Sequence, residues 1–226
     1  TLQLRYPRWI HSEFMTHRVF SRNASSSRAI PVERLIRDVL DDPVYPSHWG
    51  KNQRGMQAGE ECAAVISMCT PIDCGPDPDS ELRWHEVELS SEEAWDEARA
   101  RAVEIARAFA EAGYHKQIVN RLIEPFCHIN VVVTATEWSN FFALRCHPDA
   151  QPEMRLLAEA MRTALAKSEP LLTLPGEWHL PYVADVERIN LRLDGLSIEE
   201  RKTQYIKLSV ARCARVSYLT QDGREP

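Results

Sequence analysis

Residues 16–31, which read THRVFSRNASSSRAIP, contain many groups that bind anions: three arginines, one histidine, one asparagine and four serines. Guanidinium groups donate forked hydrogen bonds to phosphate, and hydroxyls and backbone N–H groups complete such sites. The protein as a whole carries a formal net charge of −6, so an anion site in it must be local. The cationic candidates are Arg18, Arg22 and Arg28, and His17 adds a donor that needs no full charge. The alternative is a solvated polar loop, because Ser and Asn are common in loops.

The composition argues against several functional classes. A chain of 226 residues with 44% hydrophobic residues can bury a core without disulfides, and its acidic charge disfavours a nucleic-acid partner. The six cysteines form no CxxC pair, which fits a reducing compartment. Cys127-His128 and Cys146-His147 lack the ligand spacing of a zinc site, so no metal is expected. No apolar run is long enough to span a bilayer. We therefore expect a cytoplasmic protein of a bacterium or a phage-infected host, with no membrane partner.

Hydrophobic spacing predicts the elements that must position the arginine-serine segment. Residues 2–6 alternate apolar and polar before Pro7, which predicts a strand that runs into a helix over residues 8–18. The absence of repeats and linkers favours a single α+β domain over residues 1–226. Further helices are expected at 32–41, 91–112, 115–123 and 139–145, from residue 152 and after residue 197, with a strand within 127–138 and a loop over 44–61.

Capping signals mark the two long helices. Ser90 and Glu93 have the spacing of a capping box before the helix at 91–112, and Gly113 suits its end. Ser197 and Glu200 repeat that spacing before the last helix. In the helix at 91–112 apolar residues recur three and four positions apart, so one face should be buried. The expected face consists of Trp95, Ala98, Ala102, Ile105, Phe109 and Ala112.

The order of residues in the opening segment resembles a family signature. His17-Arg18-x-x-Ser21-x-Asn23-x-x-Ser26-x-Arg28 is similar to RHRxxSxNExSxRY of the flavin-dependent thymidylate synthases. The lead-in LRYPRWIHSEFMTHR matches the strand, proline and helix that precede the signature in that family, and IVNRLIEP and NFFALRCHPDAQPEM resemble later segments. The resemblance implies the fold of that family, a mixed or antiparallel sheet packed with long helices.

The last helix extends the resemblance in an unusual order. ARCARVSY at residues 211–218 is similar to the AxRAARVSF element that most family members carry ahead of the signature. The chain therefore resembles a circularly permuted member of the family, with this element moved to the C-terminal end, which suggests a phage branch. A histidine-containing segment similar to GHxxPFEH, which normally follows that element, is lost, replaced or outside this sequence.

The family resemblance implies an activity and a cofactor. It implies C5 methylation of dUMP to dTMP, with FAD as cofactor, methylenetetrahydrofolate as carbon donor and NADPH as reductant, in a homotetramer whose active sites lie between subunits. By carry-over of the motifs, the residues expected to bind FAD are His17, Arg18, Thr134, Thr136, Asn140 and Ser217.

The resemblance also implies the residues that bind the nucleotide. Ser26 and Arg28 would hold its phosphate, Arg121 would add a charge, and Arg145 would be catalytic by polarising the pyrimidine ring. The alternative for Arg121 and Arg145 is a surface ion pair of about 0–1 kcal/mol. The full set expected to bind substrate is Glu13, Thr16, Ala24, Ser25, Ser26, Ser27, Arg28, Arg121 and Arg145.

Three departures from the signature leave other activities open. Thr16 replaces an arginine, Glu13 stands where the family has Gln, and Ala24 replaces a glutamate. A carboxylate repels phosphate but accepts a hydrogen bond from a cytosine amino group. The alternatives are a hydroxymethylase or an enzyme that acts on dCMP, or a non-catalytic protein that binds flavin and nucleotide.

The loop at residues 44–61 matches no family segment. Two interpretations are open for it: an ordered surface loop, or part of a substrate or folate site. Its candidate lining residues are Trp49, Asn52, Gln53, Met56 and Gln57.

Overall fold

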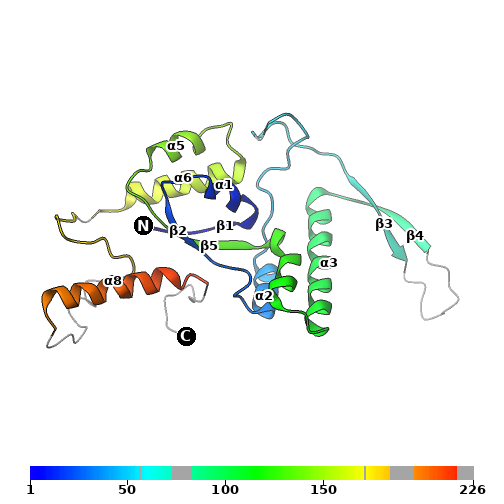
Figure 1. The fold of residues 1–226 in the computed structure, drawn as a ribbon. Helices are drawn as coiled ribbons and strands as arrows, with labels where there is room; N and C mark the ends of the chain where they lie inside the picture. Colours follow the sequence, from blue (N-terminus) through cyan, green and yellow to red (C-terminus); the bar gives the residue numbers. More distant parts are fainter. Residues whose placement is uncertain (56, 73–82, 171, 184–195, 218–226) are drawn as a thin grey trace.

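The computed structural model describes residues 1–55, 57–72, 83–170, 172–183 and 196–217. Within these residues the fold class is α+β, as predicted: helices pack around a small antiparallel sheet, and a separate two-stranded hairpin extends beyond helix α3 (Figure 1).

The central sheet attaches the motif segment to the core. Its strands are antiparallel in the order β1 (Leu2–Pro7), β5 (His128–Thr134) and β2 (Ser21–Ala24). Val131 of β5 pairs with Leu4 on one side and with Ala24 on the other. The predicted strand is confirmed but ends at Thr134. Because β2 lies within the motif and pairs with the buried strand β5, the middle of the motif is fixed to the core.

The chain between β1 and β2 is less regular than predicted. A single helix was expected over residues 8–18, whereas the structure has a 3-10 turn, η1 (Arg8–Ile10), followed by the short helix α1 (His11–Met15). The Arg22 guanidinium binds carbonyl groups at the end of this helix and in the turn that follows it, including that of Met15 at 2.7 Å. His17 consequently lies in a tight turn between α1 and β2.

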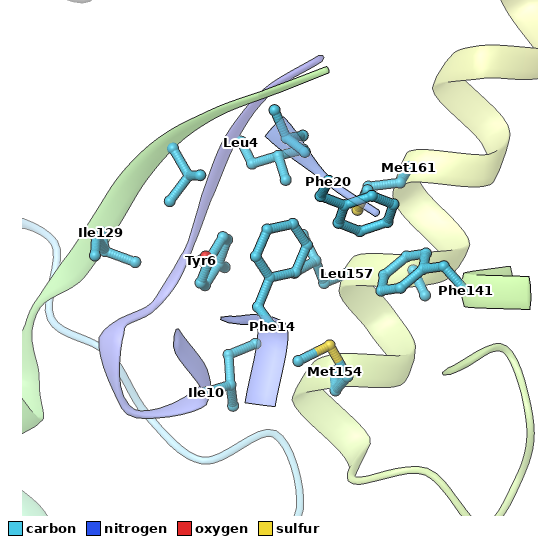
Figure 2. Close-up of a cluster of buried hydrophobic side chains, with 13 residues drawn as sticks. Leu4, Tyr6, Ile10, Phe14, Phe20, Ile129, Phe141, Met154, Leu157 and Met161 are labelled. Atoms are coloured by element: carbon cyan, nitrogen blue, oxygen red, sulfur yellow. The ribbon is translucent and has the colours of Figure 1, made fainter. Parts of the chain in front are cut away.

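The first core packs α1 against the sheet, α5 (Ser139–Arg145) and α6 (Pro152–Lys167). Figure 2 shows its aromatic and aliphatic side chains converging between the sheet and these helices. Burial of each large side chain contributes about 1.5–3 kcal/mol, so this core holds together the helices that precede His17 and carry Arg145. Its largest members, each at most 2% exposed, include Tyr6, Phe14, Phe141, Met154 and Met161.

A second core lies below the sheet, where α2 (Val32–Asp41) and α3 (Ser91–Glu111) pack on three short elements. Both halves of the capping box at Ser90 are formed, as predicted. The buried face of α3 was partly wrong: Val103 and Ala106 face the core, whereas Ala98 is exposed and Ile105 is 48% exposed. The helix expected at 115–123 is divided into α4 (Lys116–Val119) and η2 (Asn120–Leu122), which η3 (Glu124–Phe126) follows.

Two further elements flank these cores. The hairpin of β3 (Ile66–Ile72) and β4 (Arg83–Leu89) was not predicted. Helix α8 (Ile198–Ala214) begins at the predicted capping box of Ser197 and runs beside the N-terminus and β2 (Figure 1). In the described part of the chain, no helix combines the length and apolarity that a membrane crossing requires.

Candidate functional site

Arg22 is committed to the backbone of its own turn. Its guanidinium donates hydrogen bonds to the carbonyl oxygens of Met15 at 2.7 Å, His17 at 2.8 Å and Phe20 at 2.9 Å. The sequence interpretation placed Arg22 with Arg18 among the anion-binding arginines, and the structure corrects this. Since its donors are occupied, Arg22 shapes the turn that presents His17.

His17 and Arg145 meet although they are 128 positions apart in the sequence. The Arg145 Nε donates a 2.9 Å hydrogen bond to the Nε2 of His17, so the neutral imidazole carries its proton on Nδ1. Burial, together with the nearby positive charges of Arg145 and Arg22, lowers the pKa of His17. The ring is 8% exposed and packs edge-on against Phe141 at 4.8 Å. The pair therefore presents a neutral imidazole beside a fixed cation.

Arg145 has no carboxylate partner among the described residues. It is half-buried at the end of α5, and the described residues give no support to the ion-pair alternative for it. The Arg145 charge is therefore not neutralised by any acidic group of the described chain.

The other residues expected to bind FAD lie around this pair without bonding to it. Arg18 is exposed and makes no hydrogen bond to any described residue. Thr134 ends β5, where its hydroxyl shares a 2.6 Å hydrogen bond with the hydroxyl of Thr1. Thr136 is exposed in the following turn, and Asn140 is exposed in the first turn of α5. Thr134 is thus bonded to the N-terminal residue, whereas Arg18, Thr136 and Asn140 are exposed and bond to no described side chain.

The loop after β2 receives the C-terminal element. The backbone N–H of Ser26 donates to the hydroxyl of Ser217 at 2.9 Å, across 191 positions of sequence. The side-chain amide of Asn23 donates to the carbonyl oxygen of Cys213 at 2.8 Å. These two bonds fix the last turn of α8 and the ARVS residues against the motif.

A buried asparagine organises the same loop from the other side. Asn120 is 0% exposed, and its Nδ2 donates to the carbonyl oxygens of Ser27 at 2.6 Å and Ile30 at 2.9 Å. Arg28 lies between these two carbonyls in the sequence, and Arg121 follows the asparagine. Both arginines are exposed and unpaired within the described residues, which therefore give no support to the ion-pair alternative for Arg121.

The serine hydroxyls of this loop are used internally. Ser25 is buried, and its hydroxyl accepts a hydrogen bond from the backbone N–H of Asn130 at 3.1 Å. The Ser27 hydroxyl donates to Glu124, which also forms a 3.1 Å ion pair with Arg8. Both serines therefore determine the shape of the loop, and their hydroxyls already have protein partners.

The three positions that depart from the signature are at or near the surface. Glu13 accepts a hydrogen bond from the Ser12 hydroxyl at 2.9 Å and has no arginine partner among the described residues. The Thr16 hydroxyl donates to the carbonyl oxygen of Glu13 at 2.7 Å, which closes the end of α1. Ala24 ends β2 and packs against the first core. The Glu13 carboxylate therefore forms no ion pair within the described part of the chain.

Three supporting residues were missed by sequence reasoning: Asn120, Glu124 and Arg8. The first two lie within the segment IVNRLIEP, directly beside the expected Arg121. An asparagine at 0% exposure needs hydrogen-bond partners, but its burial is not visible in the sequence. No motif signal marks Arg8, because its role depends on the folded position of Ser27 and Glu124.

The fold is α+β. The motif loop follows β2, an edge strand of the sheet, and carries the exposed Arg28. The chain belongs to the thymidylate synthase complementing protein family, whose model matches residues 1–171. No curated protein gives a significant match.

Among solved structures, the chain is similar to the UMP/dUMP methylase PolB from Streptomyces cacaoi, bound with 5-Br dUMP, at 17% identity and a TM-score of 0.39. The match covers 73% of this chain and 65% of PolB.

Proposed function

We propose that the chain is an FAD-dependent enzyme that methylates C5 of dUMP to form dTMP, with methylenetetrahydrofolate and NADPH as co-substrates. The proposal rests on family membership and above all on one observation: the Ser26–Ser217 hydrogen bond joins the signature to the ARVS element. Segments that are distant in sequence but share this family resemblance therefore meet in space.

In this proposal the first half of the motif binds FAD, which supplies the hydride chemistry when bound. The donor set fits this group. Arg18 is an exposed guanidinium available to a pyrophosphate, and His17 offers a neutral imidazole within an aromatic surround that includes Phe20 and Phe141. Asn140 lies in the same helix as Phe141 and adds an exposed amide.

The second half of the motif binds the nucleotide phosphate. Arg28 and Arg121 supply guanidiniums that pair with no described residue, and the hydrogen bond from the Ser26 N–H to Ser217 sets the loop conformation. Ser25 and Ser27 act through loop shape, since their hydroxyls are already bonded. Charge-assisted hydrogen bonds of this type contribute about 1.5–3 kcal/mol each.

Arg145 acts on the pyrimidine ring between these two halves. A fixed cation beside developing negative charge stabilises it by several kcal/mol where water is excluded. Arg145 suits this role because His17 orients its Nε while no carboxylate neutralises it in the described structure. We further propose a homotetramer with intersubunit active sites, which light scattering tests.

A second candidate substrate is dCMP, and a second candidate reaction is hydroxymethyl transfer. The Glu13 observation favours dCMP: its carboxylate has no arginine partner among the described residues and can accept from a cytosine amino group. The third candidate is a non-catalytic protein that binds flavin and nucleotide.

The experiment combines a flavin spectrum with product analysis. The purified protein is mixed with FAD, and dUMP or dCMP is added while the isoalloxazine absorbance is recorded. Mass spectrometry then identifies products in the presence of methylenetetrahydrofolate and NADPH. Arg145→Lys should keep the nucleotide-induced spectral change and lose turnover, while Arg162→Lys on α6 serves as an exposed control. A protein that takes up no FAD contradicts both enzymatic proposals.

A further inference from the structure

A pocket of about 300 Å³ lies where the loop at residues 44–61 crosses the beginning of α6. Trp9 of η1, Trp95 of α3, Pro46 of the loop and Pro152 of α6 contribute its apolar walls. No residue of the proposed flavin and nucleotide site lines it. The pocket is therefore separate from the residues proposed to bind flavin and nucleotide.

The tryptophan walls are held rigidly. The rings of Trp9 and Trp95 stand nearly perpendicular, at 87° with centroids 5.6 Å apart. The indole N–H of Trp95 donates to the carbonyl oxygen of Val44 at 2.9 Å, and Phe126 packs against the same ring. This fixed arrangement means that an aromatic corner exists before any ligand arrives.

A buried carboxylate also lines the pocket. Glu153 is 8% exposed, and its Oε1 accepts hydrogen bonds from both the backbone N–H and the hydroxyl of Ser47, at 2.8 and 2.9 Å. Its Oε2 accepts only a long bond of 3.3 Å from Gln151. No Lys or Arg in the described residues pairs with Glu153. A buried carboxylate without a cation is costly, so a cation brought by a ligand would stabilise it.

The remaining polar lining lacks strong anion-binding groups. No Lys or Arg lines the pocket within the described chain. His48 also lines it, with its Nδ1 3.3 Å from the Glu61 carboxylate and its Nε2 buried without a hydrogen-bond partner. The described lining therefore offers an anionic ligand no guanidinium or ammonium donor.

We propose that this pocket binds a small organic cation, a primary or methylated ammonium or a guanidinium. Tryptophan is the best aromatic partner for such a cation, and Glu153 supplies the counter-charge. At about 30 Å³ per non-hydrogen atom, the volume accommodates a ligand of about ten such atoms. The described part of the loop at residues 44–61 thus forms one side of a ligand site.

Calorimetric titration of the full chain tests this with matched probes. Choline and agmatine should bind saturably and change tryptophan fluorescence. The neutral carbon isostere of choline, 3,3-dimethyl-1-butanol, should bind at least about tenfold more weakly, and the anion 3,3-dimethylbutyrate more weakly still. Equal binding of choline and its neutral isostere overturns the proposal, as does the absence of saturable binding.

Variants separate the charge from the shape of the pocket. Glu153→Gln keeps an acceptor for Ser47 and should abolish the preference for choline over the neutral isostere. Glu159→Gln removes a half-buried carboxylate that lies on the same helix and pairs with Arg155, and it should preserve that preference. If Glu153→Gln does not fold, Trp9→Leu takes its place and should weaken choline binding about tenfold. A preference for choline that survives Glu153→Gln, or choline binding that Trp9→Leu leaves unchanged, contradicts the assignment.

A cationic side chain from a second copy of the chain is the competing occupant. Sedimentation velocity with and without choline distinguishes it. An unchanged distribution supports a small-molecule site, whereas dissociation of an oligomer by choline overturns it. Neither outcome affects the flavin and dUMP experiments, so the two proposals fail independently.

Discussion

Replacing Asn120 with alanine tests how the nucleotide loop is held. Asn120 is 0% exposed, and its amide donates to the carbonyl oxygens of Ser27 at 2.6 Å and Ile30 at 2.9 Å. These two bonds close the segment that presents Arg28. The substitution removes both donors and leaves two part-buried or buried carbonyls without them.

The magnitude follows from the hydrogen bonds that are lost and from the atom that is removed. Two lost bonds and two carbonyls without a donor cost about 3–5 kcal/mol in total. The Oδ1 of Asn120 is itself buried without a partner, so deleting it recovers about 1–2 kcal/mol. We therefore expect Asn120→Ala to lower the free energy of unfolding by about 1–4 kcal/mol.

Equilibrium urea denaturation of both proteins measures this loss. Asn120→Asp keeps the shape of the side chain but places an oxygen against the two carbonyls. At pH 7 this variant should therefore lose more unfolding free energy than Asn120→Ala. That extra loss should shrink as pH falls, because the protonated carboxyl donates again. Arg121→Ala, at the exposed neighbouring position, should change stability by less than about 0.5 kcal/mol. An Asn120→Ala variant that unfolds at the urea midpoint of the unmodified protein would refute the reasoning.

Three further predictions concern charges in and near the site. Arg28→Ala should leave the melting temperature unchanged, since the side chain is exposed and unpaired among the described residues, but weaken nucleotide binding in calorimetry about 10–100-fold. Arg22→Lys should lower the free energy of unfolding in urea by about 1–3 kcal/mol, because an ammonium lacks the fork that spans three carbonyls. Acid should destabilise the fold below about pH 6.5, because a histidine with a lowered pKa is protonated first in the unfolded chain. The prediction rests on burial as the main cause of the lowered pKa of His11, His17 and His128. A free energy of unfolding in urea that stays constant down to pH 5 would contradict it.

Local signals in the sequence predicted the helices well. The capping boxes at Ser90 and Ser197 are formed as expected, because a capping box involves residues only three positions apart. The buried face of α3 was partly wrong because Ile105 and Val103 both fit an apolar stripe, and only the position of the second core selects Val103. The β3–β4 hairpin gave no comparable local signal.

The site was predicted as a set of residues rather than as an arrangement. The signature identified His17, the separate match of NFFALR identified Arg145, and their hydrogen bond shows that the two segments meet. Composition could not separate Arg22, which binds three backbone carbonyls, from Arg28, which is free in the described structure. That difference arises from the turn at residues 16–20, whose geometry depends on long-range packing. Asn120 escaped notice for the same reason.

The position of the ARVS element bears on the proposal that the chain is circularly permuted. Asn23 and Ser26 bind the same end of α8. The element that resembles the family's ARVS segment therefore lies against β2 and the loop after it, although it follows the other described elements in sequence. Since the site needs only that Ser217 reaches Ser26, we propose that a single domain with altered connectivity retains the family's arrangement of side chains.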